Sequence, residues 1–292
     1  MNEDIIKLAK DKGADVVGFA PVERFHDAPD DTRPNFYMKE ATVVISIGVR
    51  LLKGITEVWG DFTQTGKSIS PYLFYGYGLI NMEMSRIVLS LAKRLEAEGF
   101  KSLVFPPTWK TSMYRKFEGL LEGRMDADFS HRHAAVAAGL GDFGVNGLCL
   151  DNDVGPRIRF NSVITNAPLE ATPLYNGTKI CIPNKCNYKC ISACPAGALS
   201  REMLRCKIGD KSFEYATLDT IRCFYGITGK IKGSGGRSEI SIPEGPGEIS
   251  NWLISEEEVH PVDRALLNDC FGIICGDFCG RCLHQCPAPF DK

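Results

Sequence analysis

The sequence predicts an α+β fold in two parts, with an α/β domain over residues 1–173 and a cysteine-rich domain over residues 174–292. Two observations support this division. Helix-like and strand-like segments alternate along the first part, and eleven of the twelve cysteines lie between Cys181 and Cys286. The stretch 169–178 contains a proline and a glycine and is the boundary that composition favours.

Three segments of the first domain have the apolar spacing of helices, and each is followed by a glycine that would end it: residues 3–12, 80–98 and 130–138. Ser130 is a suitable N-cap for the third helix. Four short segments rich in Val and Ile are typical of buried strands: residues 15–20, 42–49, 102–105 and 157–165. In the second domain, the Gly-, Ser- and Pro-rich stretch 226–250 is expected to be an exposed loop.

Composition restricts the class of protein. The net charge of −2 and pI near 6.2 give no general attraction to nucleic acid or anionic lipid. The N-terminus is acidic, unlike that of a signal peptide, and no apolar run approaches the ~18 residues of a membrane span. We therefore expect a cytoplasmic protein that makes no use of a membrane.

The cysteines indicate metal rather than disulfides, because a reducing compartment disfavours a dense disulfide framework. Two segments end alike in x3-Cys-Pro, at Cys194-Pro195 and at Cys286-Pro287. This ending is typical of bacterial ferredoxins, where the last cysteine of one motif binds the other 4Fe–4S cluster. Two copies predict two cubane clusters held by eight thiolates.

The spacing of the first motif, Cys181-x4-Cys186-x3-Cys190-x3-Cys194, is wider than usual and leaves one ligand undecided. Four further cysteines compete for that place: Cys206, Cys223, Cys270 and Cys275. Zinc is the alternative, because Cys279-x2-Cys282 alone suits a zinc knuckle. The paired Cys-Pro endings have no zinc rationale, so iron–sulfur is favoured.

The run 137–147, Ala-Ala-Gly-Leu-Gly-Asp-Phe-Gly-Val-Asn-Gly, and Gly155-Pro156-Arg157 resemble epoxyqueuosine reductases and the corrinoid-binding core of reductive dehalogenases. The segment Arg222-Cys223-Phe224-Tyr225 is similar to an Arg-Cys-x-x-Tyr stretch of epoxyqueuosine reductases. The resemblance implies a nitroreductase-like core followed by a ferredoxin-like double 4Fe–4S cluster domain.

The resemblance also implies the ligands. One cluster would take Cys181, Cys186, Cys190 and Cys286, and the other Cys194, Cys223, Cys279 and Cys282. Ferredoxin spacing alone would place Cys275 in the second cluster instead of Cys223, and iron content after mutation of Cys223 distinguishes the two. Cys149, in an apolar strand, is expected to be an inert buried thiol.

A cobalamin would lie over the N-terminal core, where reduced cobalt is the nucleophile or electron donor toward the substrate. The residues near the corrin would be His131, Gly139, Gly141, Gly144, Asn146 and Gly155. The three spaced glycines also spell a dinucleotide fingerprint, but they follow a helix rather than a strand, which disfavours a nicotinamide site. A tight structural turn is the remaining alternative.

Reductive cleavage needs a proton donor. The family places an acid shortly before the glycine motif, and Asp126 is the candidate there, with a solvated carboxylate as the alternative. Dehalogenases use a tyrosine, and Tyr75 is the candidate within the aromatic stretch 72–77, with aromatic packing as the alternative.

These observations predict an oxidoreductase that passes electrons through two 4Fe–4S clusters to a cobalamin, which reduces a small-molecule substrate. A ferredoxin or flavodoxin is the expected electron donor. The end of the chain soon after Cys286 and its slightly acidic balance argue against tRNA as the substrate. Two alternatives remain: an electron carrier or reductive activator for a partner corrinoid or flavin protein, and a cluster-stabilised binding module.

Overall fold

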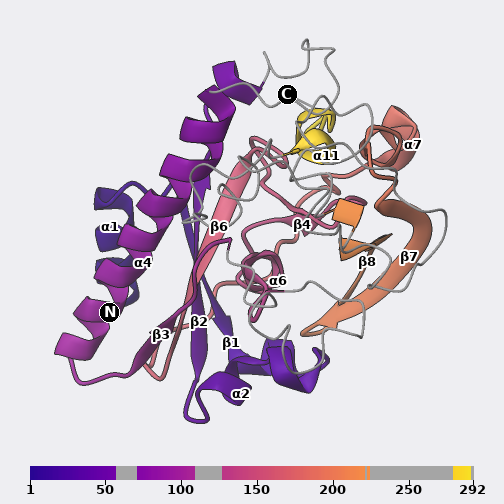
Figure 1. Ribbon diagram of the computed structural model, residues 1–292. Helices are drawn as coiled ribbons and strands as arrows, with labels where there is room; N and C mark the ends of the chain where they lie inside the picture. Colours follow the sequence, from indigo (N-terminus) through magenta and orange to yellow (C-terminus); the bar gives the residue numbers. More distant parts are fainter. Residues whose placement is uncertain (57–70, 109–126, 221, 224–278, 291–292) are drawn as a thin grey trace, which may run out of the picture.

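A four-stranded antiparallel sheet lies at the centre of the fold (Figure 1). The computed structural model describes residues 1–56, 71–108, 127–220, 222–223 and 279–290. The strands lie in the order β1-β2-β6-β3: Val16–Pro21, Val43–Arg50, Ile158–Thr165 and Ser102–Val104. All three pairings are antiparallel, which confirms the α+β class and corrects the expectation of an α/β first domain.

The central pairing joins segments that are far apart in the chain. Strand β2 pairs with β6 in a register that sets Ile45 opposite Val163. Both strands are buried on both faces over most of their length, which explains why they read as continuous apolar runs. All four predicted strands are confirmed to within one residue at each end.

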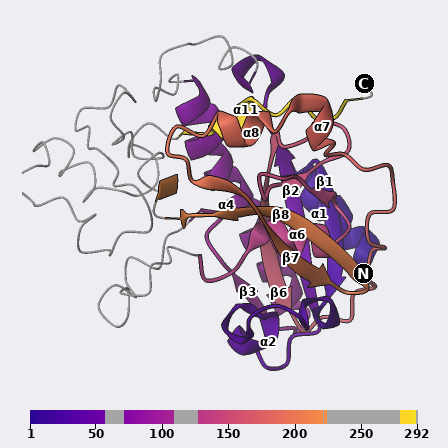
Figure 2. The ribbon, with the colours of Figure 1, turned by 90° about the vertical axis from the view of Figure 1, so that its right-hand side faces the viewer.

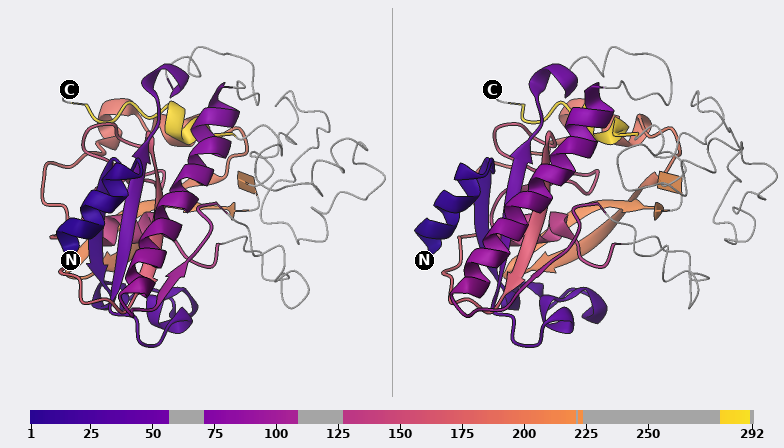
Figure 3. Two further views of the ribbon diagram at one scale, coloured as in Figure 1. Left: turned by 90° about the vertical axis from the view of Figure 1, so that its left-hand side faces the viewer. Right: turned by 60° about the vertical axis from the view of Figure 1, so that its left-hand side comes forward.

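Helices α1 (Asn2–Asp11) and α4 (Leu79–Ala97) cover one face of the sheet (Figure 3). They bury Ile5, Met84 and Leu91 against alternate residues of β2. A π-helix, η3 (Tyr72–Gly78), runs directly into α4, so this helical region begins eight residues earlier than its apolar spacing predicts.

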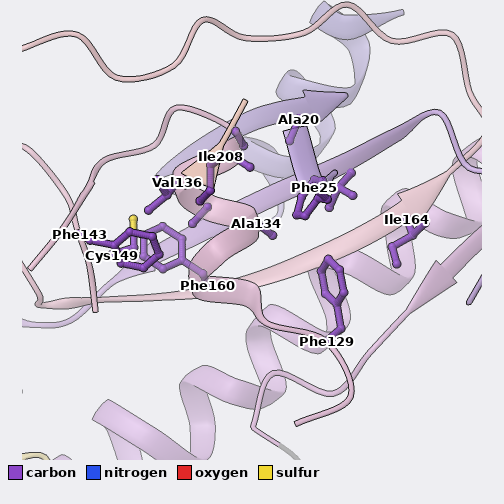
Figure 4. Packing of buried hydrophobic residues seen from close by; sticks show 14 of the residues in the cluster. Ala20, Phe25, Phe129, Ala134, Val136, Phe143, Cys149, Phe160, Ile164 and Ile208 are labelled. Carbon is purple, nitrogen blue, oxygen red and sulfur yellow. The ribbon is translucent and has the colours of Figure 1, made fainter. Parts of the chain in front are cut away.

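Helix α6 (His131–Ala137) lies on the opposite face of the sheet. Ser130 is its N-cap, as predicted, and accepts a hydrogen bond from the backbone N–H of His133. Its alanines have no exposed surface and allow the helix to approach the strands closely. Figure 4 shows Ala134 and Val136 of this helix among Ala20, Phe160 and Ile164 of the sheet.

A hairpin that the sequence analysis missed lies beyond α6 (Figure 2). Its strands are β7 (Leu199–Ile208) and β8 (Lys211–Leu218), joined by Gly209 and Asp210. Gly209 has a φ of +58°, as a tight two-residue turn requires. Ile208 joins the core beneath the hairpin (Figure 4), which fixes the hairpin to the rest of the fold.

Three one-turn helices gather at one end of the molecule (Figure 2): α7 (Pro183–Cys186), α8 (Lys189–Ser192) and α11 (Arg281–His284). Helices α8 and α11 are in contact although they come from the two ends of the cysteine-rich region. The remaining short elements are η1 (Val22–Phe25), η2 (Asp30–Thr32), α2 (Pro34–Tyr37), β4 (Asp142–Phe143) and β5 (Cys149–Leu150). The predicted loop 226–250 lies outside the described residues. None of the helices in the described ranges is long and apolar enough to cross a membrane.

Candidate functional site

Four thiols form the first thiol set: Cys181, Cys186, Cys190 and Cys286. Burial raises the pKa of Cys190 to about 12, with the three other thiols of the set as further contributors. Burial also raises the pKa of Cys286; the backbone hydrogen bond at Ala288 opposes this shift, and Cys181 and Cys186 of the same set add to it. The two Cys-Pro motifs therefore meet here, because three members come from the first motif and one from the second.

Four other thiols form the second thiol set: Cys194, Cys223, Cys279 and Cys282. Burial raises the pKa of Cys282 well above its ordinary value, and the other three members of the set add to this effect. Cys190 of the first thiol set also interacts electrostatically with Cys282, so the two sets are neighbours. The last cysteine of each motif thus lies in the other motif's set, which is the crossed arrangement of two-cluster ferredoxins.

Local backbone geometry accounts for the spacing of the first motif. Asn187 and Tyr188, between α7 and α8, have φ values of 48° and 55° in the left-handed region. Two successive left-handed residues reverse the chain, so that Cys186 and Cys190 face one site despite the three residues between them. Backbone N–H groups also reach the sulfurs: Val145 donates to Cys181 Sγ at 3.4 Å, and Ala198 to Cys194 Sγ at 3.2 Å. Such bonds stabilise thiolates.

Side chains of the first domain hold the second motif in place. The Arg157 guanidinium donates to the carbonyl of Cys286 at 2.8 Å and to that of Ala288 at 3.0 Å. Asn146 Nδ2 donates to the carbonyl of Cys282 at 3.0 Å. Asn146, predicted to lie near a corrin, is therefore bonded to the thiol-bearing loop.

The two sets differ from a site for one metal ion. Among the described residues, no three His, Cys, Asp or Glu side chains come close enough to hold a single metal ion. Both sets consist of thiols alone, which is a donor type used by iron–sulfur clusters and by zinc.

Two other described cysteines lie outside both sets. Cys149 is 3% exposed, and burial raises its pKa well above the ordinary value, which agrees with the predicted inert thiol. Cys206 lies on β7, where burial raises its pKa to about 11. Cys270 and Cys275, which also competed as ligands, lie outside the described residues.

A cavity of about 1290 Å³ opens between α6, β6 and the β7–β8 hairpin. Its apolar wall includes Phe129, Phe160 and Leu218, and Leu283 of α11 brings the second motif to its edge. Leu283 follows directly on Cys282 in the sequence, although none of the eight thiols is among the described residues that line the cavity. Drug-sized ligands occupy about 300–1,000 Å³, so this cavity has room for something larger.

The cavity wall is positively charged. Arg24 donates to the carbonyl of Ala137 at 2.5 Å, and Arg132 to that of Gly147 at 2.9 Å. Arg159 donates to the Asn81 side chain at 2.9 Å. These guanidinium groups bond neutral acceptors, so their charges remain available to an anionic ligand.

His131 is the one predicted cofactor residue that lines this cavity. Its Nε2 lies 3.1 Å from the carbonyl of Pro106 and must donate there, and its Nδ1 lies 3.1 Å from Ser162 Oγ. Burial lowers its pKa to about 4, so the ring is neutral. Both nitrogens are engaged within the protein.

Three of the four predicted glycines pack against protein backbone, and the fourth packs against side chains. A Cβ at Gly139 would lie 2.0 Å from the carbonyl oxygen of Pro173, and one at Gly141 2.0 Å from that of Leu150. A Cβ at Gly155 would lie 2.2 Å from that of Ala288, and one at Gly144 2.6 Å from the Asn146 side chain. Packing alone explains these glycines, and their contact with a corrin stays a prediction.

The two predicted proton donors are Asp126 and Tyr75, and the structure places neither of them in the cavity wall among its described residues. Asp126 lies outside the described residues. Tyr75 is 54% exposed and is not one of the described residues that line the cavity. Tyr77 lies closer, because its hydroxyl is 2.6 Å from Thr108 Oγ1 and its ring lies beneath Arg159, and both partners line the cavity.

The sequence analysis missed Tyr215 on β8. Its hydroxyl lies 2.9 Å from His133 Nε2 on the cavity wall. The dipeptide Gly209-Asp210 between two potential strands is a hairpin signal that could have indicated this element.

The fold and the thiols together define an α+β protein whose sheet is covered on both faces, with two neighbouring groups of thiols and a large cavity. Solved structures with this fold include epoxyqueuosine reductase from Bacillus subtilis, at 16% identity over 98% of this chain and 64% of that chain, with a TM-score of 0.53. The enzyme from Streptococcus thermophilus matches at 19% identity over 98% of this chain and 66% of that chain, with a TM-score of 0.51. This chain therefore spans somewhat less than two thirds of their length.

A catabolic reductive dehalogenase in complex with 3-bromo-4-hydroxybenzoic acid matches at 18% identity, over 77% of this chain and 29% of that chain, with a TM-score of 0.54. The resemblance to both groups is thus confirmed at the level of the fold. No family model matches the sequence, and no curated protein does.

The argument against tRNA is corrected. The matched structures include an epoxyqueuosine reductase with an epoxyqueuosine-modified tRNA-Tyr stem loop, at 17% identity over 78% of this chain and 56% of that chain, with a TM-score of 0.48. Net charge describes the whole surface and overlooks a local concentration of arginines such as the one that lines the cavity. An overall balance of −2 is therefore no ground for excluding tRNA.

Proposed function

We propose that this protein is an iron–sulfur reductase that passes electrons through two 4Fe–4S clusters to a substrate in the cavity beside α6. The observation that carries the proposal is the grouping of eight thiols into two neighbouring sets of four, with one cysteine of each motif in the other's set. Thiolates are the usual ligands of these clusters. The fold shared with two groups of reductases supports the same reading.

The donors fit the clusters. Each set offers four sulfurs, and backbone N–H groups donate to two of them. Without iron, thiols this close together would have to stay protonated, since burial and mutual repulsion raise their pKa. Electrons would leave through the second thiol set, because Leu283, next to Cys282, lines the cavity.

The size of the cavity and the arginines on its wall support a cobalamin there. Phe129, Phe160 and Leu218 would hold the apolar faces of a corrin, and Arg132 would meet an anionic group. When bound, this cofactor supplies a two-electron nucleophilic or reducing centre. The chain's own residues would orient it and exclude water.

A carrier that holds no cobalamin of its own is the second candidate. It is favoured by the glycines at 139, 141 and 155, which lie against protein carbonyls, so that packing accounts for them without a corrin. In this case the cavity would receive part of a partner or a smaller substrate.

The visible spectrum of anaerobically purified, iron-loaded protein mixed with hydroxocobalamin distinguishes the two candidates. The reductase proposal predicts corrin bands that stay with the protein through gel filtration and are lost in Thr217→Trp, which adds a bulky side chain to the cavity wall. Thr178→Trp is the matched control, because Thr178 is exposed and does not line the cavity. Corrin bands lost equally from all three proteins would favour the carrier, and clusters without reversible reduction would refute both.

A further inference from the structure

A chain of hydrogen bonds crosses the cavity wall from α6 to the hairpin. Ser130 Oγ lies 2.6 Å from His133 Nδ1, and His133 Nε2 lies 2.9 Å from the Tyr215 hydroxyl. Tyr215 is also hydrogen-bonded to the thiol of Cys206. All four side chains line the cavity, and none belongs to either thiol set.

The protonation of His133 gives the chain a direction. Burial lowers the pKa of this ring to about 3, so it is neutral and carries one N–H. If Ser130 donates to Nδ1, the N–H is on Nε2 and donates to Tyr215. The hydroxyl proton of Tyr215 then remains for Cys206 or for a ligand. A thiol is a weak acceptor, so a ligand oxygen or a developing anion would displace it.

We propose that Tyr215 is the proton donor of the cavity, and that His133 and Ser130 form the relay that restores its proton. This inference rests on the proposed reductase function. Tyr215 is 8% exposed and His133 packs against Phe143, so the phenol is held in a fixed orientation.

The step balances for an aryl bromide as substrate. The two clusters, when bound and reduced, would supply the two electrons. The carbon–bromine bond breaks, bromide leaves, and a carbon–hydrogen bond forms with the proton of Tyr215. The phenolate of Tyr215 takes the proton of His133 Nε2, Nδ1 takes that of Ser130, and Ser130 takes one from water.

The test uses 3-bromo-4-hydroxybenzoic acid as a probe of iron-loaded protein. Its phenol absorbs differently when ionised, so difference spectra report both binding and the pH at which the bound probe ionises. A hydrogen bond from Tyr215 favours the bound phenolate. We expect Tyr215→Phe to weaken phenolate binding roughly ten- to hundredfold and to raise the ionisation pH of the bound probe. His133→Phe should shift the ionisation in the same direction.

Tyr175→Phe is the matched control, because the Tyr175 hydroxyl bonds Asn152 and Thr178 outside the cavity. It should leave both quantities unchanged. Unchanged binding and ionisation in Tyr215→Phe would overturn the proposal, and so would a wild-type protein that binds no probe. Iron content and reversible cluster reduction, measured on the same samples, show separately whether the proposed function itself holds.

Discussion

Replacing Arg157 with Met should release the second cysteine motif from the first domain. Arg157 makes two bonds to the chain around the Cys-Pro ending, at 2.8 Å to the Cys286 carbonyl and 3.0 Å to the Ala288 carbonyl. A hydrogen bond from a charged group contributes about 1.5–3 kcal/mol. Because Arg157 is only half-buried, we take the lower end for each bond, or about 3 kcal/mol for the pair. That is roughly a hundredfold in the equilibrium between docked and released segments.

The rate at which a chelator removes iron from anaerobic protein measures this release. Cys286 belongs to the first thiol set, so Arg157→Met should lose about half of its iron much faster than the wild type. Arg86→Met is the control, because Arg86 is exposed on α4 and bonds Glu83 of the same helix, away from the cysteine motifs. Equal rates of iron loss in the two variants would refute the idea that Arg157 holds the motif.

Three further predictions concern the first domain. Leu91→Ala, at a fully buried site, should lower the free energy of unfolding by about 2–5 kcal/mol in denaturant titrations. Leu89→Ala, at a 47% exposed site, should change it little, and similar losses in the two variants would contradict the assigned core. Because the pKa of His131 falls from 6.5 to about 4 on folding, the unfolded chain binds more protons than the folded chain between these pH values. The free energy of unfolding should therefore drop by about 3 kcal/mol as the pH falls from about 6.5 to 4, and His131→Gln should flatten this pH dependence. Gly155→Ala should lower the melting temperature, since φ is +61° and the new Cβ would meet the Ala288 carbonyl. An unchanged melting temperature would show that the chain around Ala288 moves aside without a loss of stability.

Much of the first domain could be predicted because its signals are local. The apolar spacing of residues 80–98 and the cap at Ser130 depend on neighbours in sequence, and both were confirmed. Strand direction was not predictable, because β2 and β6 pair only through the folded chain. The α/β expectation came from alternation along the sequence, which does not distinguish parallel from antiparallel sheets.

The hairpin was missed for a physical reason. β7 carries Arg201, Glu202 and Arg205 on exposed positions, and its burial does not alternate regularly, so no period-2 pattern appears. The turn dipeptide Gly209-Asp210 was the one local signal for the element that carries Tyr215. The cysteine motifs, in contrast, indicate metal binding from their local spacing. The sequence does not show directly that Cys286 lies near Cys190, because folding brings them together.

Iron content of two matched variants tests the central claim most directly. If the two thiol sets hold the clusters, anaerobic Cys275→Ala should keep about eight irons per chain, and Cys223→Ala should fall to about four, because Cys223 belongs to the second thiol set. Full iron in Cys223→Ala with loss in Cys275→Ala would contradict the assignment of that set. Zinc in place of iron in the unmodified protein would contradict the account as a whole.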